Sequence, residues 1–126
     1  MIRVSLVFDF LFVGGLSSAD PITYSDDIAP VFYKKCAACH SPGQIGPFSV
    51  LDYKSVRPWA KSIAKQVEQR RMPPWGADVS KTEFTNDRSL YDEEIDLIVR
   101  WVSQGAKEGD RSKLPIAPKL SSGWAI

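Results

Sequence analysis

Several hallmarks of common functional classes are missing from this sequence. The formal net charge is only +1, whereas nucleic-acid binding normally requires a clear basic excess, so no nucleic-acid partner is expected. Neither a phosphate-binding loop nor a catalytic triad is visible. Histidine is nearly absent: the 126 residues include one histidine, two cysteines and two methionines, one of which is Met1. Any site that needs nitrogen or sulfur ligands must therefore be built from very few side chains.

The overall composition is that of one small globular domain. Hydrophobic residues make up 44% of the chain and charged residues 25%, which are ordinary values for a folded domain and do not indicate disorder. The sequence has no internal repeats and no convincing strand-like alternation. Helical patterns separated by loops predict an all-α fold instead.

Residues 1–19 have the pattern of a secretory leader. Arg3 precedes an apolar run, and the segment closes with small residues up to Ala19. This pattern predicts a signal peptide cleaved before Asp20 and therefore a periplasmic or secreted protein. The apolar run is shorter than the roughly 20 residues that span a bilayer. Asp9 interrupts it, so an uncleaved anchor stays open as an alternative, and membrane association is expected only in that case.

The most informative stretch is the C-x-x-C-H sequence of Cys36–His40. Two cysteines at this spacing, followed directly by histidine, are typical of covalent haem attachment, in which each thiol adds to a haem vinyl group. The same turn places the histidine to ligate the iron from one face. We therefore predict one haem c, attached through Cys36 and Cys39 and ligated by His40.

Three other readings of the motif stay open at this point. A thioredoxin-like redox pair would need a preceding strand and a βαβ context, whereas the residues before Cys36 have a helical pattern. A structural zinc site needs about four ligands, so two cysteines and one histidine are one ligand short unless a carboxylate joins them. The third reading is a chance occurrence of the pentapeptide.

Met72 is the predicted second iron ligand. Because His40 is the only imidazole in the chain, two histidine ligands cannot come from one molecule, and a methionine thioether is the strongest soft donor left. Pro73 and Pro74 follow Met72 and limit the freedom of its loop. A single methionine is more often core filler, but the absence of another distal donor favours ligation here.

Three helices are predicted after the leader. The first begins near Asp27, as the N-cap residue, and runs into the motif. The second starts at Ser55 and ends with Arg70 and Arg71, which suit the negative end of a helix dipole; its apolar face contains Trp59, Ile63 and Val67. The third spans residues 91–104, with an acidic first turn and an apolar stripe.

The order of these features resembles the class I cytochrome c family, in which a helix leads into C-x-x-C-H, a distal methionine lies in a later loop and a helix closes the domain. More narrowly, it resembles the single-haem domains of acidobacterial and planctomycete secreted proteins, over about residues 22 to 124. The resemblance implies a small all-α, class I cytochrome c-like fold, with three main helices and loops wrapped around one covalent haem. The matching segments are Asp27–Pro30, Cys36–His40, Gly46–Phe48, Arg57–Trp59, Met72–Trp75 and 86–109.

The resemblance also implies further contacts to the haem. The carbonyl group of Pro47 is expected to accept a hydrogen bond from the free N–H of His40. Trp59 and Trp75 are expected to line the pocket, and their indole N–H groups to bond the propionates together with Arg57. Residues 20–110 then form the cytochrome domain, and residues 111–126 form an extended tail that contains proline.

This coordination predicts an electron carrier and not an enzyme. With His40 and Met72 both on the iron no position is open for a substrate, so one-electron transfer between redox proteins is expected. One alternative is a haem domain that supplies electrons to, or senses or catalyses within, a larger oxidoreductase, with a dissociable Met72. Another is an interaction module without haem. Basic residues predict an acidic partner near the Met72 side; they are Lys61, Lys65, Arg70 and Arg71.

Overall fold

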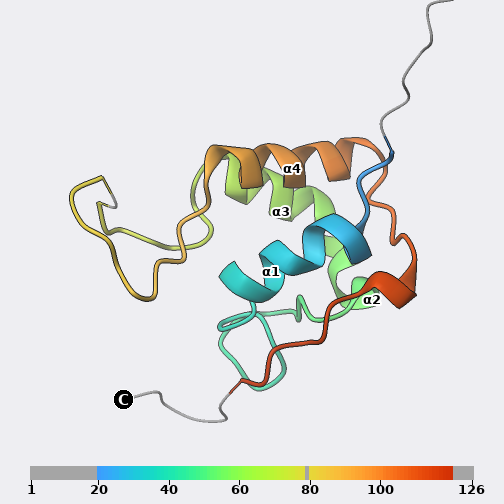
Figure 1. Ribbon diagram of the computed structural model, residues 1–126, viewed down its shortest axis with the longest axis horizontal. Helices are drawn as coiled ribbons and strands as arrows, with labels where there is room; N and C mark the ends of the chain where they lie inside the picture. The colour runs from blue at the N-terminus through green and yellow to red at the C-terminus, as the bar shows by residue number, and fades with distance from the viewer. Residues whose placement is uncertain (1–19, 79, 121–126) are drawn as a thin grey trace, which may run out of the picture.

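The computed structural model describes residues 20–78 and 80–120, and within them the chain forms helices and loops without a β-strand (Figure 1). A single bridge between Thr23 and Lys107 is the only β-type pairing in this part of the chain. The all-α prediction is confirmed. The predicted leader, residues 1–19, lies outside the described residues, as does the end of the predicted tail from residue 121.

The first helical segment begins earlier than predicted. A π-helical turn, Tyr24–Ile28 (η1), continues directly into α1, Ala29–Lys35. Its N-cap residue is Thr23, whose hydroxyl accepts the backbone N–H of Asp26 at 3.3 Å. Asp27 was therefore the wrong cap: its carboxylate instead accepts the backbone N–H of Thr23 at 2.7 Å, which stabilises the helix start from inside the first turn.

The second helical segment is interrupted, where one continuous helix was predicted. It consists of α2 (Tyr53–Val56), a 3-10 turn (Arg57–Trp59, η2) and α3 (Ala60–Glu68). Asp52 caps its start by accepting the N–H of Ser55 at 2.8 Å, so Ser55 lies inside the first turn. The interruption contains Pro58, which has no backbone N–H to donate to an α-helical hydrogen bond.

The third helix, α4 (Asp92–Ser103), lies within one residue of the predicted bounds at each end. The backbone N–H of Tyr91, the N-cap residue, donates to the carboxylate of Glu94 at 2.9 Å, which is one half of a capping box. The guanidinium group of Arg70, just after α3, forms an ion pair with Asp92. The end of α3 is thereby joined to the start of α4.

The hydrophobic core lies where η1, α1, α3 and α4 meet, and α4 runs alongside α3 (Figure 1). Trp101 of α4 is fully buried, and its ring meets that of Phe32 edge to face, with 6.4 Å between centroids. Its indole N–H donates to the carbonyl oxygen of Lys107 at 2.9 Å. The first helical segment therefore packs on the last helix through these two rings.

Two long loops complete the unit. Residues 36–52 connect α1 to α2, and the described residues 69–78 and 80–91 lie between α3 and α4, in a loop that leaves the helices before returning to them (Figure 1). None of the helices in the described ranges is long and apolar enough to cross a membrane.

Candidate functional site

A cavity of about 510 Å³ lies between the end of α1, the two long loops and one face of α3. This volume falls within the usual range for a small-molecule or cofactor pocket. Most of the lining side chains are apolar or aromatic. The cavity is lined by Phe32, Lys35, Cys36, Cys39, His40, Ile45, Gly46, Pro47, Phe48, Val50, Trp59, Ser62, Ile63, Gln66, Val67, Met72, Pro73, Pro74, Trp75 and Arg88.

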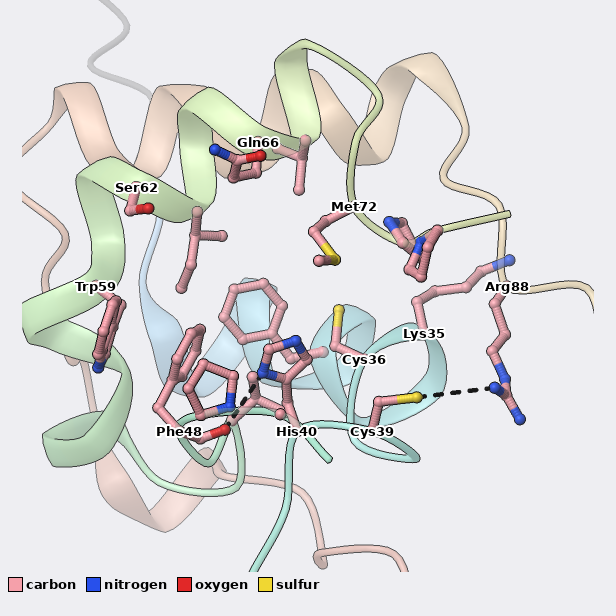
Figure 2. Close-up of a pocket in the computed structure, with 18 of the residues that line it drawn as sticks. Lys35, Cys36, Cys39, His40, Phe48, Trp59, Ser62, Gln66, Met72 and Arg88 are labelled. Atoms are coloured by element: carbon pink, nitrogen blue, oxygen red, sulfur yellow. Dashed lines mark hydrogen bonds between the residues drawn. The ribbon is translucent and has the colours of Figure 1, made fainter. Parts of the chain in front are cut away.

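The C-x-x-C-H motif forms a tight turn at one wall of this cavity. The backbone N–H groups of Cys39 and His40 both donate to the carbonyl oxygen of Cys36, at 3.1 and 2.9 Å. Cys36 and Cys39 are free thiols that line the cavity together with His40 (Figure 2). Burial, and to a smaller extent the nearby Glu94 carboxylate, raise the pKa of the Cys36 thiol to about 12, so this thiol is neutral at pH 7.

The ring of His40 is held by the loop that follows the motif. Its Nδ1 lies 3.3 Å from the carbonyl oxygen of Phe48 (Figure 2), so the expected acceptor, Pro47, is one residue away from the observed one. Pro47 itself lines the cavity. At the same edge of the ring, a Cβ atom at Gly46 would lie 2.6 Å from both His40 Nδ1 and the carbonyl oxygen of Cys39. Only glycine allows the loop to approach the histidine this closely.

Met72 reaches the same cavity from the loop after α3. Its backbone N–H donates to the carbonyl oxygen of Gln66 at 3.3 Å, which ties the loop to the last turn of the helix. Its thioether points into the cavity, toward the side that holds Cys36 and His40 (Figure 2). The structure thus brings all four predicted attachment and ligand residues to one apolar cavity.

Two predicted pocket tryptophans also line the cavity. Trp59 stacks on Phe48, with 4.8 Å between ring centroids and 12° between the planes, and is 41% exposed at the cavity edge. Trp75 meets Phe84 edge to face at 5.8 Å. The indole nitrogen of Trp75 is buried and has no hydrogen-bond partner among the described residues. A ligand with an acceptor atom would satisfy that group.

Two cations at the cysteine end of the cavity were missed by sequence reasoning. Lys35 is only 3% exposed; its ammonium group donates to the carbonyl oxygen of Asp87 at 3.4 Å and lies 5.0 Å from the ring centre of Tyr91. Arg88 lies beside Cys39, with 4.0 Å between Nη1 and Sγ (Figure 2). The position of Lys35 in the turn before the motif could have indicated that it lies near the cavity. No sequence feature indicated this for Arg88.

One of the basic residues predicted to attract a partner already forms an ion pair within the protein. Arg70 is paired with Asp92, and among the cavity-lining residues the only cations are Lys35 and Arg88. Lys61 and Lys65 lie on the exposed side of α3. The positive charge closest to the candidate site is therefore at the cysteine end.

The surroundings of the motif do not match those of a thioredoxin-like redox pair or of a zinc site. A thioredoxin-like pair requires a βαβ unit, and residues 20–78 and 80–120 contain no strand. No group of three or more His, Cys, Asp or Glu side chains that could hold a metal ion is found among these same residues. What surrounds the two thiols is an apolar cavity of cofactor size.

Comparison with known proteins agrees with this site. The family model described as cytochrome C oxidase, cbb3-type, subunit III matches residues 25–102, which include the C-x-x-C-H motif, Met72 and most of α4. No curated protein and no solved structure matches the chain. The matched region covers more than half of the sequence. The chain therefore belongs to this family of cytochrome c domains, whose members carry covalently bound haem and transfer electrons.

Proposed function

We propose that this protein is a mono-haem, class I c-type cytochrome that transfers one electron at a time between redox proteins. Haem c would be attached through Cys36 and Cys39 and ligated by His40 and Met72. When bound, haem supplies the reversible exchange between ferric and ferrous iron, and methionine ligation tends to raise its potential. We also propose that the protein is of the same kind as the single-haem domains of secreted bacterial proteins. Its proposed location is periplasmic or secreted.

The observation that carries this proposal is the convergence of two attachment thiols and two ligand side chains on one cavity. Cys36, Cys39 and His40 come from one tight turn, and Met72 comes from a separate loop, yet all four line the same space. The remaining walls are mostly apolar, which suits a porphyrin. The indole N–H of Trp75 on the cavity wall is buried and has no hydrogen-bond partner among the described residues, so an acceptor atom of a bound group would satisfy it.

The protein's own residues have distinct tasks in this function. The carbonyl group of Phe48 accepts the Nδ1–H of His40, which leaves Nε2 free of a proton and available as a ligand atom. The short tie from Met72 to Gln66 limits how far the thioether can move away. With His40 and Met72 both holding the iron, a substrate would have no access to it, and the domain would act as a carrier.

Absorption spectra of protein matured with the haem-attachment machinery test the proposal. The wild-type protein should have a c-type spectrum with the weak far-red band of sulfur-to-iron charge transfer. Met72→Ala should lose that band and keep the covalent haem. Ile45→Ala is the matched control, because Ile45 also lines the cavity but is 91% exposed and has no donor atom.

Each other result points to a different function. A c-type spectrum without the far-red band, together with rapid binding of carbon monoxide by the wild type, would favour the sensing or catalytic alternative with a dissociable Met72. An unchanged band in Met72→Ala would exclude Met72 as the ligand. Protein without haem after maturation in a periplasm would contradict the proposal as a whole.

A further inference from the structure

The cysteine end of the cavity carries a positive charge that the haem site itself does not use. This inference rests on the proposed function. We propose that Arg88 is the docking point for a carboxylate group of the redox partner, so that an acidic protein surface sits over Cys39 when the electron is exchanged. Arg88 is half-buried at the cavity wall, and its guanidinium group lies beside the Cys39 sulfur (Figure 2).

Arg88 differs from the arginines that have structural ion pairs. Arg70, Arg100 and Arg111 form ion pairs with Asp92, Asp96 and Glu108. Arg88 has no carboxylate within ion-pair distance in the described part of the chain, and its contact with Cys39 is a weak one, because sulfur is a poor acceptor. A guanidinium group presents two parallel N–H donors that match a carboxylate, so a partner's Asp or Glu side chain suits this position.

The neighbouring acidic groups are already engaged elsewhere. The carboxylate of Asp87 accepts the backbone N–H of Ser89 at 2.7 Å. The carboxylate of Glu94 accepts the backbone N–H of Tyr91 at 2.9 Å. Neither carboxylate is within ion-pair distance of Arg88. The ammonium group of Lys35, which also lines the cavity, adds positive charge there but is buried and therefore cannot contact a partner.

The haem propionates are not expected to use Arg88. In haem the two vinyl groups that react with cysteines are on one half of the porphyrin and the two propionates are on the other half. Trp59 and Ser62 lie at the end of the cavity away from Cys39 and Arg88 (Figure 2). Arg88 would therefore be next to the thioether edge of an attached haem, and a partner bound there would be close to the porphyrin.

Stopped-flow oxidation of the ferrous protein by two small oxidants tests this proposal. Hexacyanoferrate(III) is an anion and tris(phenanthroline)cobalt(III) is a cation; each accepts one electron from the protein, and no proton or covalent bond is transferred. Loss of one positive charge at the contact point should slow the anionic oxidant about three- to tenfold at low salt, and salt should remove the difference. Arg88→Gln should show this loss, and Arg88→Lys should restore most of the rate.

Arg100→Gln is the matched control, because it removes the same charge from an exposed site on α4 that does not line the cavity. Its rates should stay close to wild type with both oxidants. Poly-L-glutamate, added at constant ionic strength, should inhibit oxidation by hexacyanoferrate in the wild type and inhibit it much less in Arg88→Gln.

Several outcomes would overturn the docking role. Equal losses in Arg88→Gln and Arg100→Gln would reveal an effect of net charge alone. Slowing of both oxidants by Arg88→Gln would mean that the substitution changes the iron potential. Inhibition by inorganic phosphate but not by poly-L-glutamate would reveal a site for small anions only. Absence of a c-type spectrum before mixing would instead be a failure of the proposed function.

Discussion

The ring of His40 packs against the ring of Phe48, with 4.7 Å between centroids, while His40 Nδ1 lies 3.3 Å from the carbonyl oxygen of the same residue. One loop residue therefore fixes both the position and the orientation of the histidine. Gly46 allows this arrangement, because the loop backbone passes directly beside the imidazole. Three consecutive loop residues, Gly46 to Phe48, thus line the cavity around the single histidine of the chain.

Gly46→Ala should displace the histidine. The added Cβ would lie 2.6 Å from His40 Nδ1 and from the carbonyl oxygen of Cys39, and the latter is backbone that cannot rotate away. We expect a loss of about 1–3 kcal/mol in the free energy of unfolding, measured by urea titration, and a lower yield of haem-loaded protein. Gly76→Ala is the control, because no atom lies within 4 Å of its added Cβ. Equal behaviour of the two variants would contradict this account of Gly46.

Lys35→Met should lower the reduction potential of the haem-loaded protein. A buried positive charge on the cavity wall disfavours the ferric form, so its removal should shift the equilibrium toward ferric iron by about three- to tenfold. A tenfold change is 59 mV for one electron. Lys34→Met is the matched control, since Lys34 is the exposed neighbour of the buried Lys35. Spectroelectrochemical titration measures both, and an equal shift in the two variants would exclude the role of burial.

Trp101→Phe should destabilise the core without changing the site. The substitution removes ring volume from a fully buried position and deletes the hydrogen bond to the carbonyl oxygen of Lys107. Together these losses should lower the free energy of unfolding by about 2–4 kcal/mol. Ile116→Ala should change it by less than about 0.5 kcal/mol, because Ile116 is 96% exposed. Chemical unfolding of both variants checks the difference, and similar midpoints would contradict the assignment of Trp101 to the core.

Stability should fall as the solution becomes acidic. Asp78, Asp87 and Asp110 each have a folded-state pKa below the ordinary value of 3.8, chiefly because their carboxylates accept hydrogen bonds from Ser80, Ser89 and Ser112. A lowered folded-state pKa adds stability that is present above the unfolded-state pKa and is lost as pH falls through the folded-state value. Unfolding titrations from pH 6 down to about 3 should therefore show a declining free energy. The variant with all three residues changed to Asn should show a smaller decline, and an unchanged slope would refute the assignment.

Local patterns in the sequence were sufficient for the motif and for the last helix. The C-x-x-C-H spacing, the acidic first turn and the apolar stripe of α4 are each determined by residues close together in the chain, so they could be read without a structure. The Met72 assignment also began from sequence, by elimination among very few donors. Its position on the cavity wall agrees with that reading, and the ligand role itself stays a prediction.

Features that depend on distant residues could not be predicted. Thr23 and Asp27 are both good caps, and the choice between them depends on the backbone pairing of Thr23 with Lys107. The break before α3 moves Trp59 off the buried face of the helix and onto Phe48. Arg88 and Cys39 are separated by 49 positions in the chain, so only the folded loop brings them together.

The pairing near Thr23 also determines how the helical unit connects to the rest of the polypeptide. The backbone N–H groups of Tyr24 and Ser25 donate to the carbonyl oxygens of Lys107 and Glu108, both at 2.9 Å, so the entry to η1 and the exit from α4 lie side by side. Chain entering and leaving the helices passes through this one corner. The start and the end of the helical unit are thus held together by backbone hydrogen bonds, and residues 111–114 then continue along the unit, where Leu114 packs against the core.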